Sequence, residues 1–195
     1  MLFNLENLSI SWWRRAITCL FGGCAILMAS LAFGGHIDNP SSKIQFTATQ
    51  SEVAIDGKFQ KFVADVDFDP AAPAAGKVDL VIDLASVSTG SSEADELLKG
   101  KEFFDAAHFP QASFSARSIN TTGPGHFQAP GQFTLKGRST TIVVPFTART
   151  EGAGLRIEGR LPLSRLAYHV GEGQWADTGT LDDQVQILFS LYLPR

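Results

Sequence analysis

Eight stretches between residues 42 and 193 place apolar side chains at every second position. This is the period of a β-strand that shields one face from water. Eight such strands predict an all-β fold, an eight-stranded antiparallel barrel whose interior holds a small apolar ligand. The apolar sets are Ile44, Phe46 and Ala48; Phe62, Ala64, Val66 and Phe68; Val78, Leu80, Ile82 and Leu84; Ala112, Phe114 and Ala116; Phe127, Ala129, Phe133 and Leu135; Ile142, Val144, Phe146 and Ala148; Leu155, Ile157, Leu161 and Leu163; and Val185, Ile187, Phe189, Leu191 and Leu193.

Turn motifs separate these stretches and favour hairpins between neighbours. They are Asp56-Gly57, Asp69-Pro70, Pro124-Gly125, Lys136-Gly137 and Gly152-Ala153-Gly154. Two connections, residues 85–111 and 164–184, are longer than a hairpin needs. Within the first, between the third and fourth strands, residues 92–99 predict a short helix, with Ser92 as its cap and Asp95 three residues on.

The two long connections are candidates for the mouth of the barrel, because long loops in compact domains often carry function. The first contains Phe103, Phe104 and Phe109, and the second contains Tyr168 and Trp175. An alternative interpretation is that the phenylalanine cluster only plugs one end of the barrel.

The first 32 residues have the pattern of a secretory signal. Arg14 and Arg15 precede an uncharged apolar run, and Ser30 and Ala32 are the small residues of a cleavage site. We therefore expect cleavage after Ala32, one domain over residues 33–195, and export to the periplasm. The alternative is an uncleaved inner-membrane anchor, because residues 16–33 are just long enough to span a bilayer.

Composition excludes several classes of function. Both cysteines, Cys19 and Cys24, lie in the predicted signal, so the remaining domain has no disulfide and no thiolate chemistry. The whole chain has a formal net charge of −4, which gives no footprint for nucleic acid. An outer-membrane barrel would need longer strands and aromatic girdles, and the domain has a single tryptophan, Trp175.

Catalytic and metal patterns are weak in this sequence. The acidic run Asp65, Asp67 and Asp69 lacks the glycine and glutamate that a calcium loop of this type requires. The four histidines show no metal-ligand spacing, and there is no nucleophile elbow or phosphate loop. We therefore expect no enzyme activity, no cofactor and no metal. The alternative is an enzyme or a stress-related structural protein on the same barrel, with a packed interior.

Residues 83–116 resemble the central signature of the YceI-like family of secreted lipid-binding proteins. The matching elements are Ser88-Thr89-Gly90, Asp95 with Leu98, Phe103-Phe104-Asp105, and Phe109-Pro110 followed by Phe114. Around them, Gly57 with Phe59, Gly131 to Gly137, and Arg165 also match. The resemblance implies a lipocalin-like barrel in the bacterial periplasm that encloses a long apolar molecule, a polyisoprenoid in characterised members.

The sequence thus predicts a periplasmic protein that sequesters or carries an isoprenoid-type lipid, polyprenyl or quinone-like, in transient contact with a membrane. Arg165 is the candidate for a charged head group, because a guanidinium pairs well with phosphate. Its alternative role is an ion pair with Asp182 or Asp183. The expected ligand-binding residues are Phe46, Phe62, Ile82, Phe103, Phe104, Phe109, Phe114, Phe133, Phe146, Arg165, Tyr168, Trp175 and Phe189.

Overall fold

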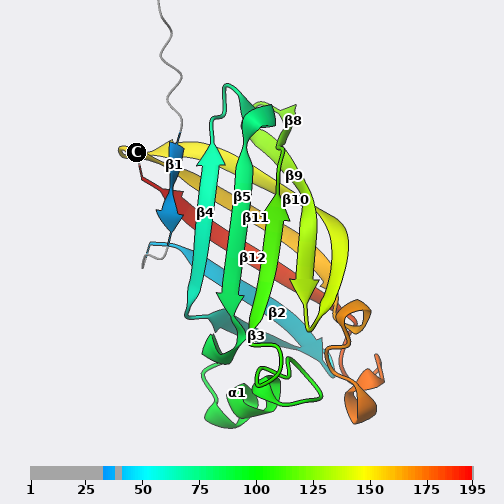
Figure 1. Ribbon diagram of the computed structural model, residues 1–195. Helices are drawn as coiled ribbons and strands as arrows, with labels where there is room; N and C mark the ends of the chain where they lie inside the picture. Colours follow the sequence, from blue (N-terminus) through cyan, green and yellow to red (C-terminus); the bar gives the residue numbers. More distant parts are fainter. Residues whose placement is uncertain (1–32, 38–40, 195) are drawn as a thin grey trace, which may run out of the picture.

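Twelve strands form one antiparallel sheet that curls into a barrel-like shape (Figure 1). The computed structural model describes residues 33–37 and 41–194. The strands are β1 (Phe33–Ile37), β2 (Lys43–Gln50), β3 (Val53–Phe59), β4 (Phe62–Phe68), β5 (Lys77–Asp83), β6 (Val87–Ser88), β7 (Gln111–Ala116), β8 (Asn120–Gly123), β9 (His126–Leu135), β10 (Arg138–Glu151), β11 (Gly154–Ser164) and β12 (Gln184–Leu193). The helices are α1 (Ser92–Lys99) and the short 3-10 turns η1 (Pro73–Ala75), η2 (Leu84–Ser86), η3 (Leu166–Tyr168) and η4 (Gly173–Ala176).

The all-β, antiparallel architecture is confirmed, but the strand count of eight is wrong. The eight expected strands are present as β2, β4, β5, β7, β9, β10, β11 and β12. Strands β1, β3, β6 and β8 are additional. Three of these are only two to five residues long, which is too short for alternation to stand out from the surrounding sequence.

Strand β3 escaped prediction because Asp56-Gly57 has the composition of a turn and yet lies inside the strand. The real hairpin turn between β2 and β3 is at Ser51 and Glu52, whose φ angles are 47° and 67°. Two central residues with positive φ match the twist of a two-residue hairpin. Lys136-Gly137 also has positive φ at both residues and forms the predicted turn between β9 and β10.

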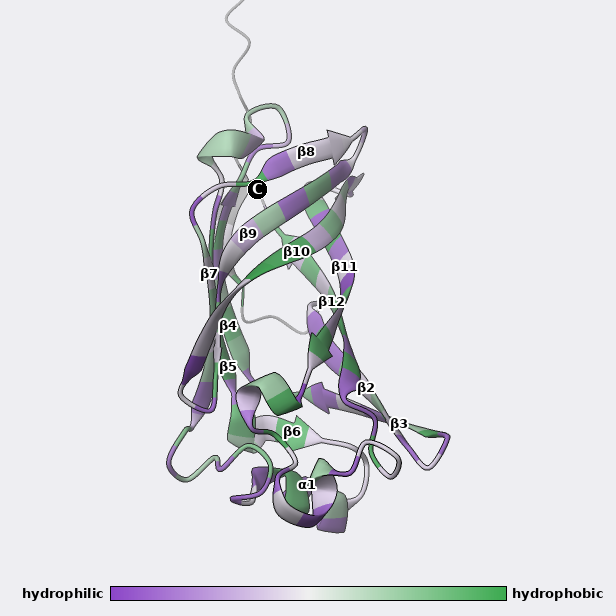
Figure 2. Ribbon diagram, turned by 90° about the vertical axis from the view of Figure 1, so that its right-hand side faces the viewer, coloured by the Kyte–Doolittle hydropathy of each residue, from purple (hydrophilic) through white to green (hydrophobic). Residues whose placement is uncertain are grey.

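The predicted inward positions do face the interior. Hydrophobic and hydrophilic residues alternate along much of the longer strands (Figure 2), and the apolar positions of the alternation line the lumen or pack in the buried core. The buried core divides into two clusters, one at each end of the barrel. Phe68 and Leu193 are fully buried in the first, and Leu84 is nearly so in the second.

The curled sheet has one seam that no strand ladder closes. Its hydrogen-bonded order is β1-β4-β5-β7-β9-β10-β11-β12-β2-β3-β6, so neither β2 nor β3 pairs with β4. At one end of the seam β1 pairs with β4 and packs against β12. At the other end Ser86 joins the turn between β3 and β4, where its Oγ accepts a hydrogen bond from Lys61 N at 3.0 Å.

Helix α1 spans the predicted residues, but its cap differs from the expectation. Ser91 precedes the first turn, and its Oγ accepts a hydrogen bond from Ala94 N. Asp95 instead accepts from the amide and the hydroxyl of Thr89, at 2.6 and 2.8 Å. Asp95 therefore fastens the helix to the segment before it.

The predicted signal, residues 1–32, lies outside the described residues, so its cleavage stays a prediction. Within the part of the chain that the structure describes, no helix is long and apolar enough to cross a membrane.

Candidate lipid-binding lumen

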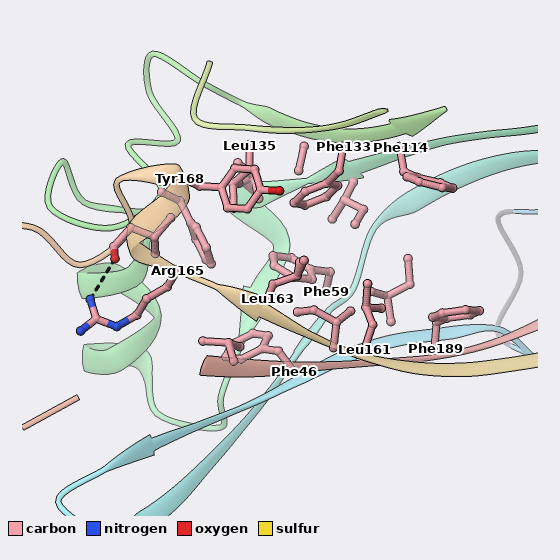
Figure 3. Close-up of a pocket in the computed structure, with 18 of the residues that line it drawn as sticks. Phe46, Phe59, Phe114, Phe133, Leu135, Leu161, Leu163, Arg165, Tyr168 and Phe189 are labelled. Carbon is pink, nitrogen blue, oxygen red and sulfur yellow. Dashed lines mark hydrogen bonds between the residues drawn. The ribbon is translucent and has the colours of Figure 1, made fainter. Parts of the chain in front are cut away.

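The interior of the barrel contains a cavity of about 270 Å³, lined by side chains from β2, β3, β4, β5, β7, β9, β10, β11 and β12, from α1 and from the loop after β11. This volume is near the lower end of the range for small-molecule pockets, roughly 300 Å³. Figure 3 shows Phe114, Phe133 and Leu135 on one wall, opposite Phe46, Leu161 and Phe189 on the other. Most of the wall is aliphatic or aromatic carbon, which suits an apolar occupant.

Most of the residues expected to bind ligand line this cavity. They are Phe46, Ile82, Phe103, Phe104, Phe114, Phe133, Phe146, Arg165, Tyr168, Trp175 and Phe189. Two are placed elsewhere. Phe62 packs between the two core clusters, beside the seam. Phe109 rests its ring against Gly137 in the turn after β9, outside the lumen.

Several residues that line the cavity were not predicted to bind ligand. Phe59 was missed together with β3, and Leu97 and Leu98 were not assigned because the helix was read as a connection. Leu161, Leu163 and Ile187 belong to the predicted inward sets and line the cavity as that parity implies.

Three glycines in the strands determine how much of the lumen stays open. A Cβ on Gly57 would lie 2.6 Å from Cε1 of Phe46, and one on Gly159 would lie 2.6 Å from Cε1 of Phe189. A Cβ on Gly131 would lie 2.7 Å from Cζ of Phe114. Each phenylalanine ring therefore lies against bare backbone, in space that any other residue would fill. The rings cover the wall without crossing the barrel.

One end of the lumen is closed by an aromatic cluster. The ring of Phe68 lies edge-on to Phe127 and Phe146, with centroids 5.0 and 5.5 Å apart, and Phe127 stacks on Phe146 at 5.5 Å. Such geometries are favourable beyond the burial of area. Ile119, which is 1% exposed, packs in the same cluster.

The opposite end is covered by the two long connections, which meet there. Glu102 O accepts hydrogen bonds from Gly171 N and Glu172 N, at 2.8 and 3.0 Å. The rings of Phe103 and Trp175 are 5.5 Å apart, and Tyr168 lies edge-on to Phe133 at 5.2 Å. Helix α1 lies below them and contributes Leu97, which is 41% exposed. This end, which is covered by loops, is the candidate mouth.

Lys136, whose side chain is 8% exposed, links the turn after β9 to both connections. Lys136 Nζ donates to Lys101 O at 2.9 Å, to His169 O at 2.6 Å and to Glu172 Oε2 at 3.4 Å. The hydrogen bond from His169, with the charge of Lys136 nearby, holds the pKa of Glu172 below its usual value. The ammonium group of Lys136 thus joins the two long connections at the mouth through one backbone carbonyl of each.

Arg165 has a structural role that neither sequence hypothesis foresaw. Its side chain is 4% exposed, and all five of its N–H groups donate to backbone carbonyls. Nε donates to Asp182 O at 2.9 Å, and the terminal nitrogens donate to the carbonyls of Val170, Gly171, Trp175 and Leu181 at 2.6–3.0 Å. Burial lowers the pKa of this guanidinium, against the opposing charges of Asp183 and Asp182.

The expected head-group role of Arg165 therefore has no free donor to support it. The guanidinium points away from the lumen side chains (Figure 3). The alternative of an ion pair is also wrong in detail, because Asp182 contributes its carbonyl oxygen and not its carboxylate. Arg165 organises the loop that covers the mouth.

Comparison with known proteins places the chain in a family. The model of the YceI-like domain matches residues 36–193. The chain belongs to the YceI-like family. A UPF0312 protein of Yersinia pestis is 29% identical over 143 residues, which are 69% of this chain and 71% of the relative.

Two solved structures have the same fold as this chain. BcnA of Burkholderia cenocepacia is 38% identical and superposes with a TM-score of 0.78, over 80% of this chain and 98% of that one. A polyisoprenoid binding domain from Saccharophagus degradans, implicated in plant cell wall breakdown, is 17% identical with a TM-score of 0.65. That match covers 82% of this chain and 98% of the other, and at this identity it concerns the fold alone.

Replacing Gly159 by alanine should destabilise the protein. The new methyl group would overlap the ring of Phe189 and the carbonyl oxygen of Pro145, so we expect the free energy of unfolding to fall by about 1–3 kcal/mol. The control is Gly123→Ala in β8, where a Cβ would have its nearest neighbour at 4.0 Å and should change stability by less than about 0.5 kcal/mol. Equal denaturant midpoints for the two variants would contradict the close packing of Phe189 on Gly159.

Replacing Arg165 by methionine should be among the most damaging single changes. Five carbonyls would lose a buried donor, at about 1–3 kcal/mol for each carbonyl left unsatisfied. Lysine at this position should recover little, because an ammonium cannot reproduce the planar five-donor geometry. Arg160→Met, on the exposed face of β11, is the matched control. A variant Arg165→Met with the stability of the wild type would restore the head-group hypothesis.

Proposed function

We propose that this protein sequesters or carries an isoprenoid-type lipid in its lumen, in the periplasm of a bacterium. The observation that carries the proposal is the apolar cavity itself, which lies between an aromatic plug at one end and a cover of loops at the other. A flexible hydrocarbon chain suits such a wall chemically, because it replaces water around the wall without needing polar partners.

The polar groups of the lumen favour binding over catalysis. Among the described residues, the wall contains no carboxylate, histidine, lysine or cysteine. Its polar side chains are those of Gln50, Ser164, Arg165, Tyr168 and Trp175, and Arg165 is fully engaged with backbone carbonyls. General acid–base or nucleophilic catalysis needs a titratable pair facing one space. The alternative of a barrel with a packed interior does not account for the cavity.

The family comparison supports the class of ligand. A structural neighbour with the same fold is described as a polyisoprenoid binding domain. Periplasmic location rests on the predicted signal in residues 1–32. Loading from a membrane would use the mouth, where exposed Leu97 of α1 offers an apolar contact. Both a polyprenyl and a quinone-like lipid agree with this proposal.

The lumen can be tested with two neighbouring valines of β10. Val144 lines the cavity, whereas Val143 points outward and is 51% exposed. Val144→Trp fills the lumen without adding charge, so we expect binding of the polyprenol solanesol to weaken at least about tenfold, which corresponds to about 1.4 kcal/mol. Val143→Trp adds the same bulk outside and should bind like the wild type.

The readout is a titration of each folded variant, with circular dichroism to verify the fold. Equal affinities of the two variants for solanesol would refute binding in the lumen. If Val144→Trp fails to fold, Val144→Phe provides a smaller filling side chain for the same comparison.

A further inference from the structure

The seam of the barrel carries a groove on its outer surface that the lumen does not account for. It lies where β2 and β3 face β4 without a strand ladder between them. Lys43, Lys58 and Lys61 border it, and Val63 and Val81, each 37% exposed, form an apolar part of its floor. We refer to these five residues as the seam groove.

The seam groove has an excess of positive charge. Within the described part of the chain, no carboxylate forms an ion pair with the ammonium group of Lys43, Lys58 or Lys61. The acidic residue on the groove is Asp83, whose Oδ1 accepts a hydrogen bond from Ala85 N at 3.0 Å. Three cations that border one hollow attract an anion, since field lines are focused in a cleft.

The wall between this groove and the lumen is one side chain thick. Ile44 and Phe59 line both the lumen and the groove. The rings of Phe59 and Phe46 are 5.7 Å apart on the lumen side. The cationic surface outside and the apolar space inside thus adjoin at the seam, where no strand ladder joins β4 to β2 or β3.

We propose that the seam groove binds the phosphate-type head group of an amphiphilic isoprenoid, with Val63 and Val81 in contact with the start of its chain. The proposal rests on the proposed function for the class of ligand, and it moves the head-group site from the mouth to the side of the barrel. The pairing of compact ammonium groups with phosphate oxygens supplies the recognition. An uncharged polyprenol gains nothing from this groove.

Three probes distinguish a lipid head group from a free anion. They are farnesyl diphosphate, its uncharged alcohol farnesol, and inorganic diphosphate. The groove variant is Lys43→Gln, Lys58→Gln and Lys61→Gln together. The control is Lys77→Gln, Arg138→Gln and Arg160→Gln, which removes the same charge from exposed positions outside the groove. Calorimetric titration at low and high salt measures each affinity.

We expect the groove variant to bind farnesyl diphosphate at least about tenfold more weakly than the control variant, since three ion pairs of modest strength are lost. Added salt should weaken binding of this probe to the wild type and hardly affect farnesol. Equal affinities of the groove and control variants for farnesyl diphosphate would overturn the proposal. It would also be overturned if inorganic diphosphate bound as tightly as farnesyl diphosphate, because the groove would then be a site for free anions. If the wild type does not bind farnesol, the result counts against ligand binding in the lumen. The seam groove is still tested by the affinities of the groove variant and the control variant for farnesyl diphosphate.

Discussion

The close contact between phenylalanine rings and bare backbone keeps the lumen open. The interior of a small barrel is just wide enough for its own side chains to fill or for one small ligand. Because the wall at Gly57, Gly131 and Gly159 has no side chains, the rings of Phe46, Phe114 and Phe189 can lie flat on it. The inward face stays mostly apolar, and space remains between the opposite walls. Both the cavity and its suitability for hydrocarbon follow from this one arrangement.

The two ends of the lumen are closed by different physical means. At one end, rings pack on rings around Phe68, and no polar group is needed. At the other end, irregular backbone must be satisfied, and Arg165 and Lys136 do this by donating to carbonyls of the covering loops. A hydrogen-bonded cover of loops opens locally at less cost than a packed aromatic core. Ligand exchange at the loop end agrees with that difference.

This use of the cations changes where a charged head group can be held. Arg165 and Lys136 are consumed by the cover, so the mouth offers no unpaired cation among the described residues of the wall. Lys43, Lys58 and Lys61 sit on the outer surface at the seam, one side chain away from the lumen. The seam exists because β4 pairs with β1 and β5 and leaves β2 and β3 on the other side.

The sequence was sufficient to predict the parts of the fold that depend on periodicity. The inward positions of Phe133, Ile187 and the other wall residues follow from alternation alone. The helix at residues 92–99 was also predicted, although its cap is Ser91 and not Ser92. Strand β3 was missed because the sequence alone suggests a turn at Asp56-Gly57. In the structure Gly57 lies inside the strand, where the absence of a side chain leaves room for the ring of Phe46. The role of Arg165 was missed because its partners are carbonyls, which every residue possesses and no pattern marks. The seam could not be predicted from the sequence either, because it depends on which strands do not pair with each other.

The most direct test of the lumen is to extract the protein, exported and purified from the bacterial periplasm, with organic solvent and to identify what it releases by mass spectrometry. The account predicts one class of long isoprenoid lipid, released in an amount close to that of the protein. Val144→Trp, purified in parallel, should release much less of it. A wild-type protein that releases no lipid, or only the phospholipid mixture of the surrounding membrane in trace amounts, would contradict the claim that the barrel is built to hold an apolar chain.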